Sequence, residues 1–130
     1  MFHRVAATVL FVQDLARCVE FYRDTLGLQV TESTPELASF QMENVYFLLM
    51  QVSAAAHMLG EEANTLKIEG GPRGLLAAGV EDVDAAYETL KARGATLLKP
   101  PTNQPWGLRT AYFADPEGNL WEINQPVVSE

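Results

Sequence analysis

The chain has 130 residues, of which 48% are hydrophobic and 20% are charged, as in an ordinary globular protein of one domain. Its formal net charge of −8 argues against a nucleic-acid-binding protein, because such proteins need clustered basic side chains to neutralise phosphates. The N-terminal apolar run over residues 5–12 is too short to cross a membrane. The single cysteine, Cys18, excludes an intramolecular disulfide. We therefore expect a cytoplasmic protein that binds neither nucleic acid nor membrane.

The first half of the chain predicts a strand, a helix and three further strands. Residues 4–12 are apolar at nearly every position, as in a strand that a helix covers on one face and that borders a cavity on the other. Asp14 can cap a helix that Gly27 ends. Three strands are then predicted over residues 28–31, 37–42 and 45–52.

The same order returns after residues 53–73, a segment without clear periodicity that reads as a linker with one helical turn. Residues 74–81 predict a strand, Asp82 can cap a helix that Gly94 ends, and residues 95–99 predict a strand that Pro100-Pro101 stops. The last two strands, over residues 110–113 and 120–123, flank the turn sequence DPEGN and form a hairpin.

Two stretches of the halves resemble each other directly. DLARCVEFYRDTLGLQV at 14–30 matches DVDAAYETLKARGATLL at 82–98, and NVYFLL from Asn44 matches NLWEIN from Asn119. Two units are too few for a solenoid, so they must bury their faces on each other. The prediction is one α+β domain over residues 1–130, with βαβββ modules at about 4–52 and 74–125 and a linker at about 53–73.

Three motifs resemble those of a known family. They are V-x-D-L-x-x-x-x-x-F-Y-x-D-x-L-G-L from Val12 to Leu28, V-x-D-V-D-A-A-Y-x-x-L-K-A-R-G-A from Val80 to Ala95, and F-x-D-P-x-G-N-x-x-E-I from Phe113 to Ile123. The chain thereby resembles the vicinal oxygen chelate superfamily, which includes glyoxalase I, bleomycin-resistance proteins and extradiol dioxygenases. The resemblance implies the glyoxalase/bleomycin-resistance fold, in which curved mixed sheets form a cup, and a homodimer.

The resemblance also implies four positions that hold a divalent metal ion in many members, two on each module. Counting from Asp14 and Asp82 places two of them at Ala7 and Leu75, and the internal repeat places the others at Phe47 and Glu122. Alkyl and phenyl side chains offer a cation no lone pair. The prediction is therefore no metal at the family position and no cofactor.

The parity of the strands predicts what lines the cup if Ala7 faces inward, because alternate residues of a strand share a face. The cavity would be mostly apolar, with one carboxylate and one amide, as in small-molecule sites. The predicted ligand-binding residues are Ala7, Val9, Phe11, Phe47, Leu49, Leu75, Trp106, Arg109, Glu122 and Asn124.

Several of these residues have a second interpretation. The apolar side chains could pack against each other or against a dimer partner, and Glu122 could form a salt bridge with Arg109. Trp106 and Arg109 could stack on an aromatic ligand or clamp an anion. Equally, Trp106 could cover the sheet edge while Arg109 neutralises Asp115 and Glu117.

Two functions follow. The first is a metal-independent protein of the glyoxalase/bleomycin-resistance type whose apolar cup binds a small aromatic molecule, as in drug sequestration. The alternative is an enzyme, a lyase or isomerase of glyoxalase type, in which Glu122 acts as the catalytic general base. Tyr46 and Tyr112 are candidate proton donors for that reaction. Because only one donor side chain remains at the family metal positions, the sequence favours binding.

Overall fold

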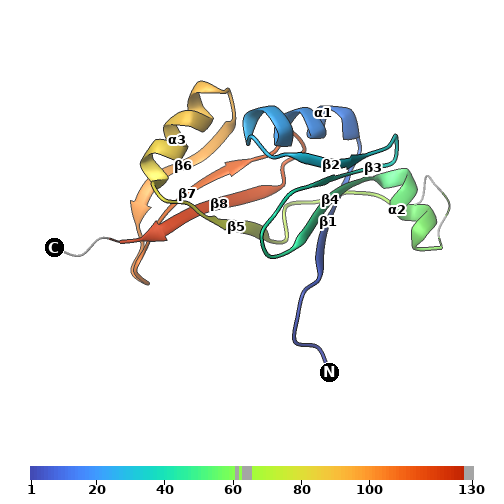
Figure 1. Ribbon diagram of the computed structural model, residues 1–130, viewed down its shortest axis with the longest axis horizontal. Coiled ribbons are helices and arrows are strands. Elements are labelled where there is room, and N and C mark those ends of the chain that lie inside the picture. The colour runs from blue at the N-terminus through green and yellow to red at the C-terminus, as the bar shows by residue number, and fades with distance from the viewer. Residues whose placement is uncertain (61, 63–65, 128–130) are drawn as a thin grey trace. The chain divides into compact units, whose positions relative to one another are not determined.

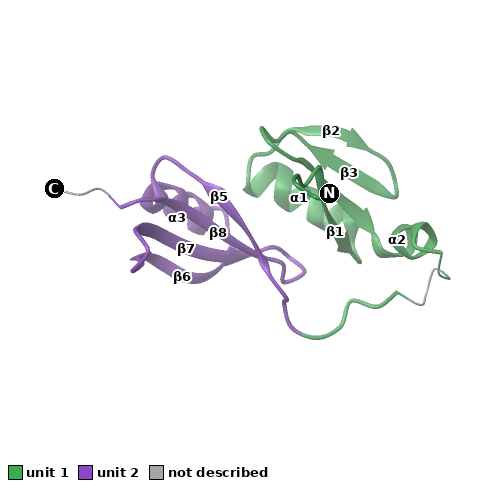
Figure 2. Ribbon diagram, turned by 90° about the horizontal axis from the view of Figure 1, so that it is seen from below, with its two compact units in different colours: residues 1–70 green, residues 71–130 purple. Residues whose placement is uncertain are grey.

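The computed structural model describes residues 1–60, 62 and 66–127, in two compact units, Met1–Gly70 and Gly71–Glu130 (Figures 1 and 2). The boundary between the units lies within the predicted linker. Among the described residues, no helix is long and apolar enough to cross a membrane. That both units together form one domain stays a prediction.

Each unit is a four-stranded mixed sheet with the predicted βαβββ order, so the α+β fold class is confirmed (Figure 1). In unit 1 the strand order is β1-β4-β3-β2, and in unit 2 it is β5-β8-β7-β6. The first and last strands of each unit run parallel, and the other neighbours run antiparallel.

The elements of unit 1 are β1 (Ala7–Val12), α1 (Leu15–Glu20), a π-helical turn (Phe21–Thr25), β2 (Val30–Ser33), β3 (Leu37–Phe40), β4 (Tyr46–Gln51) and α2 (Val52–Met58). Those of unit 2 are β5 (Leu75–Gly79), α3 (Val83–Ala92), β6 (Thr96–Asn103), β7 (Leu108–Ala114) and β8 (Leu120–Pro126).

The predicted helix caps are present in both units. Asp14 Oδ1 accepts a hydrogen bond from the backbone N–H of Arg17 at 3.1 Å, three residues on. Asp82 Oδ1 does the same for Ala85, also at 3.1 Å. Such a bond satisfies one of the backbone donors that every helix leaves unpaired in its first turn. The two aspartates therefore fix where α1 and α3 begin.

The helices cover one face of each sheet and enclose its core. In unit 1, the ring of Tyr22 lies 5.7 Å from that of Phe40 and 5.4 Å from that of Phe47. In unit 2, Phe113 and Trp121 stack with their ring centroids 6.1 Å apart. Figure 2 shows α3 along one face of the purple sheet. Burial of these aromatic side chains is the main stabilising contribution within each unit.

The prediction that Pro100-Pro101 ends the sixth strand is wrong. β6 continues through both prolines to Asn103, and its register against β7 shifts between Lys99 and Thr102. β6 is an edge strand of its sheet, where a proline that cannot donate a hydrogen bond is tolerated, especially at a bulge. The longer strand brings the end of β6 level with the start of β7.

Candidate functional site

Each sheet has a second face that its helices do not cover, which we call the helix-free face. In unit 2 the register pairs Glu122 of β8 with Ala77 of β5 and with Tyr112 of β7. Paired residues share a face, so these three side chains stand on the same side of the sheet. Trp121 and Ile123, next to Glu122 in sequence, are buried on the helix side.

The helix-free face of unit 2 carries a connected polar network centred on Glu122. The Tyr112 hydroxyl donates a hydrogen bond to Glu122 Oε1 at 2.7 Å. Asn124 Nδ2 donates to Glu122 Oε2, also at 2.7 Å. Both carboxylate oxygens thus have a donor at the short distance typical of charge-assisted hydrogen bonds. Glu122 is half-buried, in contrast to its buried neighbours Trp121 and Ile123.

The network extends from Tyr112 along β7. Gln104 Nε2 donates a hydrogen bond to Thr110 Oγ1 at 3.0 Å, and the Thr110 and Tyr112 side chains are hydrogen-bonded to each other. The bond with Thr110 lowers the pKa of the Tyr112 phenol. The hydrogen bond to Glu122, burial and the charge of Glu122 outweigh it, so the pKa is raised overall. Tyr112 therefore keeps its proton more firmly than an ordinary tyrosine.

The turn between β7 and β8 sets this register. Asp115 is buried, and its Oδ1 accepts hydrogen bonds from the backbone N–H groups of Glu117 and Asn119, both at 2.9 Å. Its Oδ2 accepts from Asn119 Nδ2 at 2.8 Å. These bonds close the predicted DPEGN turn, after which Ala114 faces Leu120 and Tyr112 faces Glu122. Asp115 is thus a structural residue that positions the network.

In unit 1, β1 pairs Ala7 with Tyr46 and Val9 with Leu48 of β4. These residues, with Phe11 and Met50, make the helix-free face of unit 1. The prediction that Phe47 and Leu49 share the face of Ala7 is wrong. Phe47 is only 1% exposed, and its ring contacts that of Tyr22, which follows α1, so it belongs to the helix-side core.

The error came from aligning the repeat one residue out of register. Gln51 Oε1 accepts a hydrogen bond from the backbone N–H of Leu15, and Gln125 Oε1 accepts one from that of Val83. The two glutamines are therefore equivalent, each joining the last strand of its sheet to the first turn of its helix. Three residues before Gln125 stands Glu122, so its equivalent in unit 1 is Leu48 and not Phe47.

Arg109 does not belong to the polar network, in contrast to the prediction. Its guanidinium donates to both carboxylate oxygens of Asp84 in α3, each at 2.8 Å, and to Asn103 Oδ1 at 3.0 Å. Arg109 stands three residues before Tyr112 on β7 and thus on the opposite face. The pair raises the pKa of Arg109 and lowers that of Asp84, through their hydrogen bond first and their charges second. Arg109 fastens α3 to its sheet.

Trp106 lies in the turn between β6 and β7, where it is 64% exposed. On β7, Leu108 is four residues from Tyr112, which corresponds to about 13 Å of extended strand. The structure of unit 2 therefore does not bring Trp106 beside Glu122. Leu75, Glu122 and Asn124 do share the helix-free face of unit 2, and Leu75 is 47% exposed there.

The residues present do not fit a divalent metal ion at the family positions. Ala7 and Leu48 in unit 1 and Leu75 in unit 2 carry no donor atom, and both Glu122 oxygens already accept hydrogen bonds. Within residues 1–60, 62 and 66–127, no three His, Cys, Asp or Glu side chains gather as metal ligands would. We derive no step through a metal ion.

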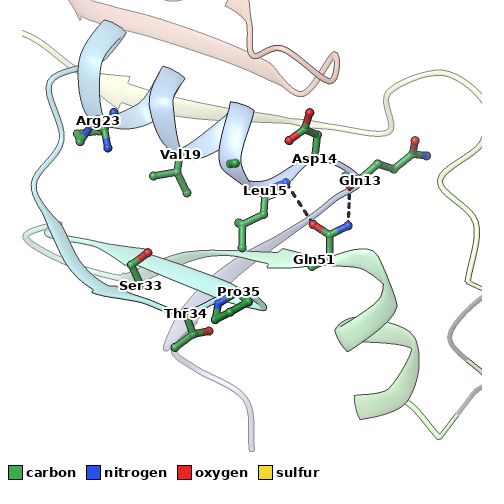
Figure 3. Close-up of a pocket in the computed structure, with 10 residues that line it drawn as sticks. Gln13, Asp14, Leu15, Val19, Arg23, Ser33, Thr34, Pro35 and Gln51 are labelled. Atoms are coloured by element: carbon green, nitrogen blue, oxygen red, sulfur yellow. Dashed lines mark hydrogen bonds between the residues drawn. The ribbon is translucent and has the colours of Figure 1, made fainter.

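A groove of about 620 Å³ lies elsewhere, on unit 1 (Figure 3). Its polar groups serve the fold: Gln51 Nε2 donates to the Gln13 carbonyl at 2.6 Å, Asp14 caps α1, and Arg23 pairs with Asp24 at 2.8 Å. None of the predicted ligand-binding residues lines it. The lining residues are Gln13, Asp14, Leu15, Ala16, Val19, Arg23, Ser33, Thr34, Pro35 and Gln51.

Two βαβββ units with parallel first and last strands define the glyoxalase fold, and sequence comparison agrees. The profile of the Glyoxalase/Bleomycin resistance protein/Dioxygenase superfamily matches residues 4–123, so the chain belongs to that superfamily. It is 38% identical over 117 residues to the uncharacterized protein YraH of Bacillus subtilis, covering 88% of this chain and 91% of that one.

Two further relatives cover most of the chain. A probable lactoylglutathione lyase of Vibrio cholerae is 27% identical over 136 residues, covering 95% of this chain and 91% of the relative. The crystal structure of a glyoxalase/bleomycin resistance protein/dioxygenase from Nocardioides matches with a TM-score of 0.84 and 28% identity. That match covers 100% of this chain and 87% of the other. These relatives share the fold of this chain, but their names do not agree on one activity.

Sequence reasoning missed Thr110 and Gln104 and left the direction of Tyr112 open. The hairpin itself holds the missing signal. Counting outward from Ala114 and Leu120, which close the turn, pairs Tyr112 with Glu122 and Thr110 with Asn124. Gln104 has no such signal, because its position depends on the extension of β6 through two prolines.

Proposed function

We propose that this protein is a metal-free small-molecule-binding protein and that Glu122 is the polar anchor for its ligand. The observation that carries the proposal is the network on the helix-free face of unit 2. There Tyr112 and Asn124 each donate a hydrogen bond of 2.7 Å to the carboxylate of the half-buried Glu122. Fixed polar groups on an otherwise apolar surface are what orient small ligands.

Apolar side chains beside the network support an aromatic or amphipathic ligand. Leu75, Ala77 and Leu120 share the face of Glu122, and Leu75 and Ala77 are exposed. On unit 1 we propose that Ala7, Val9 and Phe11, joined by Leu48 in place of Phe47, form an apolar surface of that unit's own helix-free face. Contact of a ligand with such surface would be favourable by about 25 cal/mol per Å² removed from water.

The donor set supports binding without a metal ion. Alanine and leucine at three of the four family positions give an ion nothing to coordinate, and Glu122 alone would hold it weakly. Elemental analysis of the purified protein tests this part of the proposal. We expect less than about 0.1 equivalent of any divalent metal. One equivalent that is lost on Glu122→Gln substitution would overturn it.

Binding itself is tested by a thermal-shift screen of small aromatic compounds against the wild type, Glu122→Gln and Glu88→Gln. Glu88 is exposed on α3, so its substitution removes the same charge away from the proposed site. A hit should stabilise the wild type and Glu88→Gln alike, and Glu122→Gln far less. Equal stabilisation of all three proteins would show that the compound does not bind through Glu122, and would contradict the proposed site.

A second candidate function rests on the Tyr112–Glu122 pair. A carboxylate and a phenol at 2.7 Å can act as general base and proton donor, which suits a lyase or isomerase of glyoxalase type. The probable lactoylglutathione lyase of Vibrio cholerae suggests the assay, formation of lactoylglutathione. Turnover that Glu122→Gln abolishes would favour the enzyme, whereas turnover that survives the substitution would remove Glu122 as its base.

We further propose a cytoplasmic homodimer. The support for the dimer is membership of a superfamily whose members commonly dimerise, and the support for the location is the use of a single cysteine, Cys18, in the whole sequence. Light scattering of the purified protein should give twice the 14.3 kDa of the chain. A mass that stays at one chain across the accessible concentrations would contradict the dimer.

A further inference from the structure

Both side-chain hydrogen bonds to Glu122 end on its carboxylate, because Tyr112 and Asn124 are the donors. Gln104 Nε2 donates to Thr110 Oγ1 at 3.0 Å, so the threonine hydroxyl keeps its own proton to donate. The bond between Thr110 and Tyr112 lowers the pKa of Tyr112, as expected if threonine donates to the phenol oxygen. Tyr112 then donates a hydrogen bond to Glu122 Oε1. Each donor polarises the next.

As a consequence, this face presents hydrogen-bond acceptors to a ligand and few hydrogen-bond donors. The Tyr112 hydroxyl and one Asn124 N–H are already used in hydrogen bonds to Glu122. A carboxylate has about four lone-pair positions, of which these two bonds occupy two. What remains for a ligand is the rest of the Glu122 lone pairs, the Asn124 side-chain oxygen and one Asn124 N–H. A ligand that matches them must itself be a hydrogen-bond donor.

Within unit 2, no basic side chain of the described residues 71–127 forms an ion pair with Glu122. The nearest candidate by sequence, Arg109, is held on the other face by Asp84. The net charge of −8 adds a field that attracts cations to the whole molecule.

We propose that the ligand of this face is an organic cation, a protonated amine joined to an aromatic or apolar body. The ammonium group donates to Glu122 and Asn124 while the apolar body lies over Leu75 and Ala77. This inference rests on the proposed binding function and specifies the class of ligand. It excludes carboxylate-bearing aromatic compounds, because they would bring a second negative charge against Glu122 without an intervening cation.

The test compares three indole compounds that differ only in the end group of their side chain: tryptamine, tryptophol and indole-3-propionate. Isothermal titration calorimetry at pH 7 and low salt measures each dissociation constant on the full-length protein. We expect tryptamine to bind at least about tenfold more tightly than tryptophol, as a charge-assisted hydrogen bond to a partly buried carboxylate allows. Indole-3-propionate should bind most weakly.

Two further measurements assign the preference to Glu122. In Glu122→Gln the ratio of tryptamine to tryptophol affinity should fall below about threefold, because the amide has lost the charge. In Glu88→Gln, which loses the same charge from α3, the ratio should stay near its wild-type value. In the wild type, raising NaCl from about 20 to 500 mM should weaken tryptamine and leave tryptophol unchanged, since only the charged pair is screened.

The outcomes distinguish a failure of the organic-cation proposal from a failure of the proposed small-molecule binding. Tryptophol binding as tightly as tryptamine, or a preference that survives Glu122→Gln or high salt, would overturn the organic cation and leave small-molecule binding standing. Failure of all three compounds to bind the wild type would count against both.

Discussion

The two units follow one plan, but their helix-free faces have different chemistry. In unit 1, Leu48 stands between Val9 and Ser39 at the position where unit 2 has Glu122. In unit 2 that carboxylate is joined to Tyr112 and Asn124 by hydrogen bonds of 2.7 Å. The helix-covered faces, by contrast, are both closely packed with aromatic rings. The two units are therefore alike in the packing on their helix-covered faces, while they differ on their helix-free faces.

The largest expected effect is a loss of stability when the aromatic core on the helix-covered face of unit 1 is disrupted. Phe47→Ala removes a ring that contacts both Tyr22 and Phe40, and should lower the free energy of unfolding by about 3–5 kcal/mol. Val9→Ala, on the helix-free face of the same sheet, should cost about 1 kcal/mol or less. Urea denaturation followed by circular dichroism measures both. Equal effects would mean that the two faces of unit 1 are misassigned.

The next largest effect concerns the polar network on the helix-free face of unit 2. Tyr112→Phe deletes one of the two donors to Glu122 and should cost about 0.5–1.5 kcal/mol of stability, a modest figure because the site is partly exposed. Tyr46→Phe is the matched control on unit 1, where Tyr46 is 48% exposed, and should change stability by less than about 0.5 kcal/mol. If both variants behave alike, the bond to Glu122 contributes nothing to folding.

The same tyrosine predicts a pH dependence. Its pKa is raised in the folded protein, so its contribution to stability is present in full below the unfolded pKa of about 10 and is lost as pH rises through the folded value. Between about pH 9 and 11 the wild type should therefore lose stability more steeply than Tyr112→Phe. Thermal unfolding at each pH measures the difference. Parallel curves for the two proteins would contradict the raised pKa.

The smallest effect concerns Arg109. Its salt bridge with Asp84 is exposed, and exposed pairs contribute little to stability. Arg109→Lys should lower the melting temperature less than Tyr112→Phe does and leave the affinity for tryptamine unchanged, because the residue is on the helix-covered face. A marked loss of affinity would indicate that Arg109 takes part in ligand binding, and would contradict its assignment to the helix-covered face.

The sequence was sufficient for the elements whose signals are local. Asp14 and Asp82 mark helix starts because the cap is made within three residues, and the DPEGN turn is determined by its own side chains. The predicted parity of Leu75, Glu122 and Asn124 agrees with the register of β5 and β8. The face of Phe47 could not be read reliably, because a shift of one residue in aligning the repeat moves every side chain to the other face.

The remaining errors concern contacts between residues distant in sequence. The partner of Arg109 is Asp84, 25 residues away on α3, and nothing local distinguishes Asp84 from Glu122, Asp115 or Glu117 as its partner. The extension of β6 through Pro100 and Pro101 depends on β6 being an edge strand, which only the assembled sheet reveals. Gln104 joined the network through that extension.

Nuclear magnetic resonance mapping of tryptamine on the ¹⁵N-labelled protein tests the central claim most directly, because it reports both units at once. The largest shift changes should fall on the helix-free face of unit 2, at Ala77, Tyr112, Glu122 and Asn124, and should be much smaller in Glu122→Gln at the same tryptamine concentration. Shift changes concentrated instead around Val19, Thr34 and Gln51, in the groove of unit 1 shown in Figure 3, would contradict it.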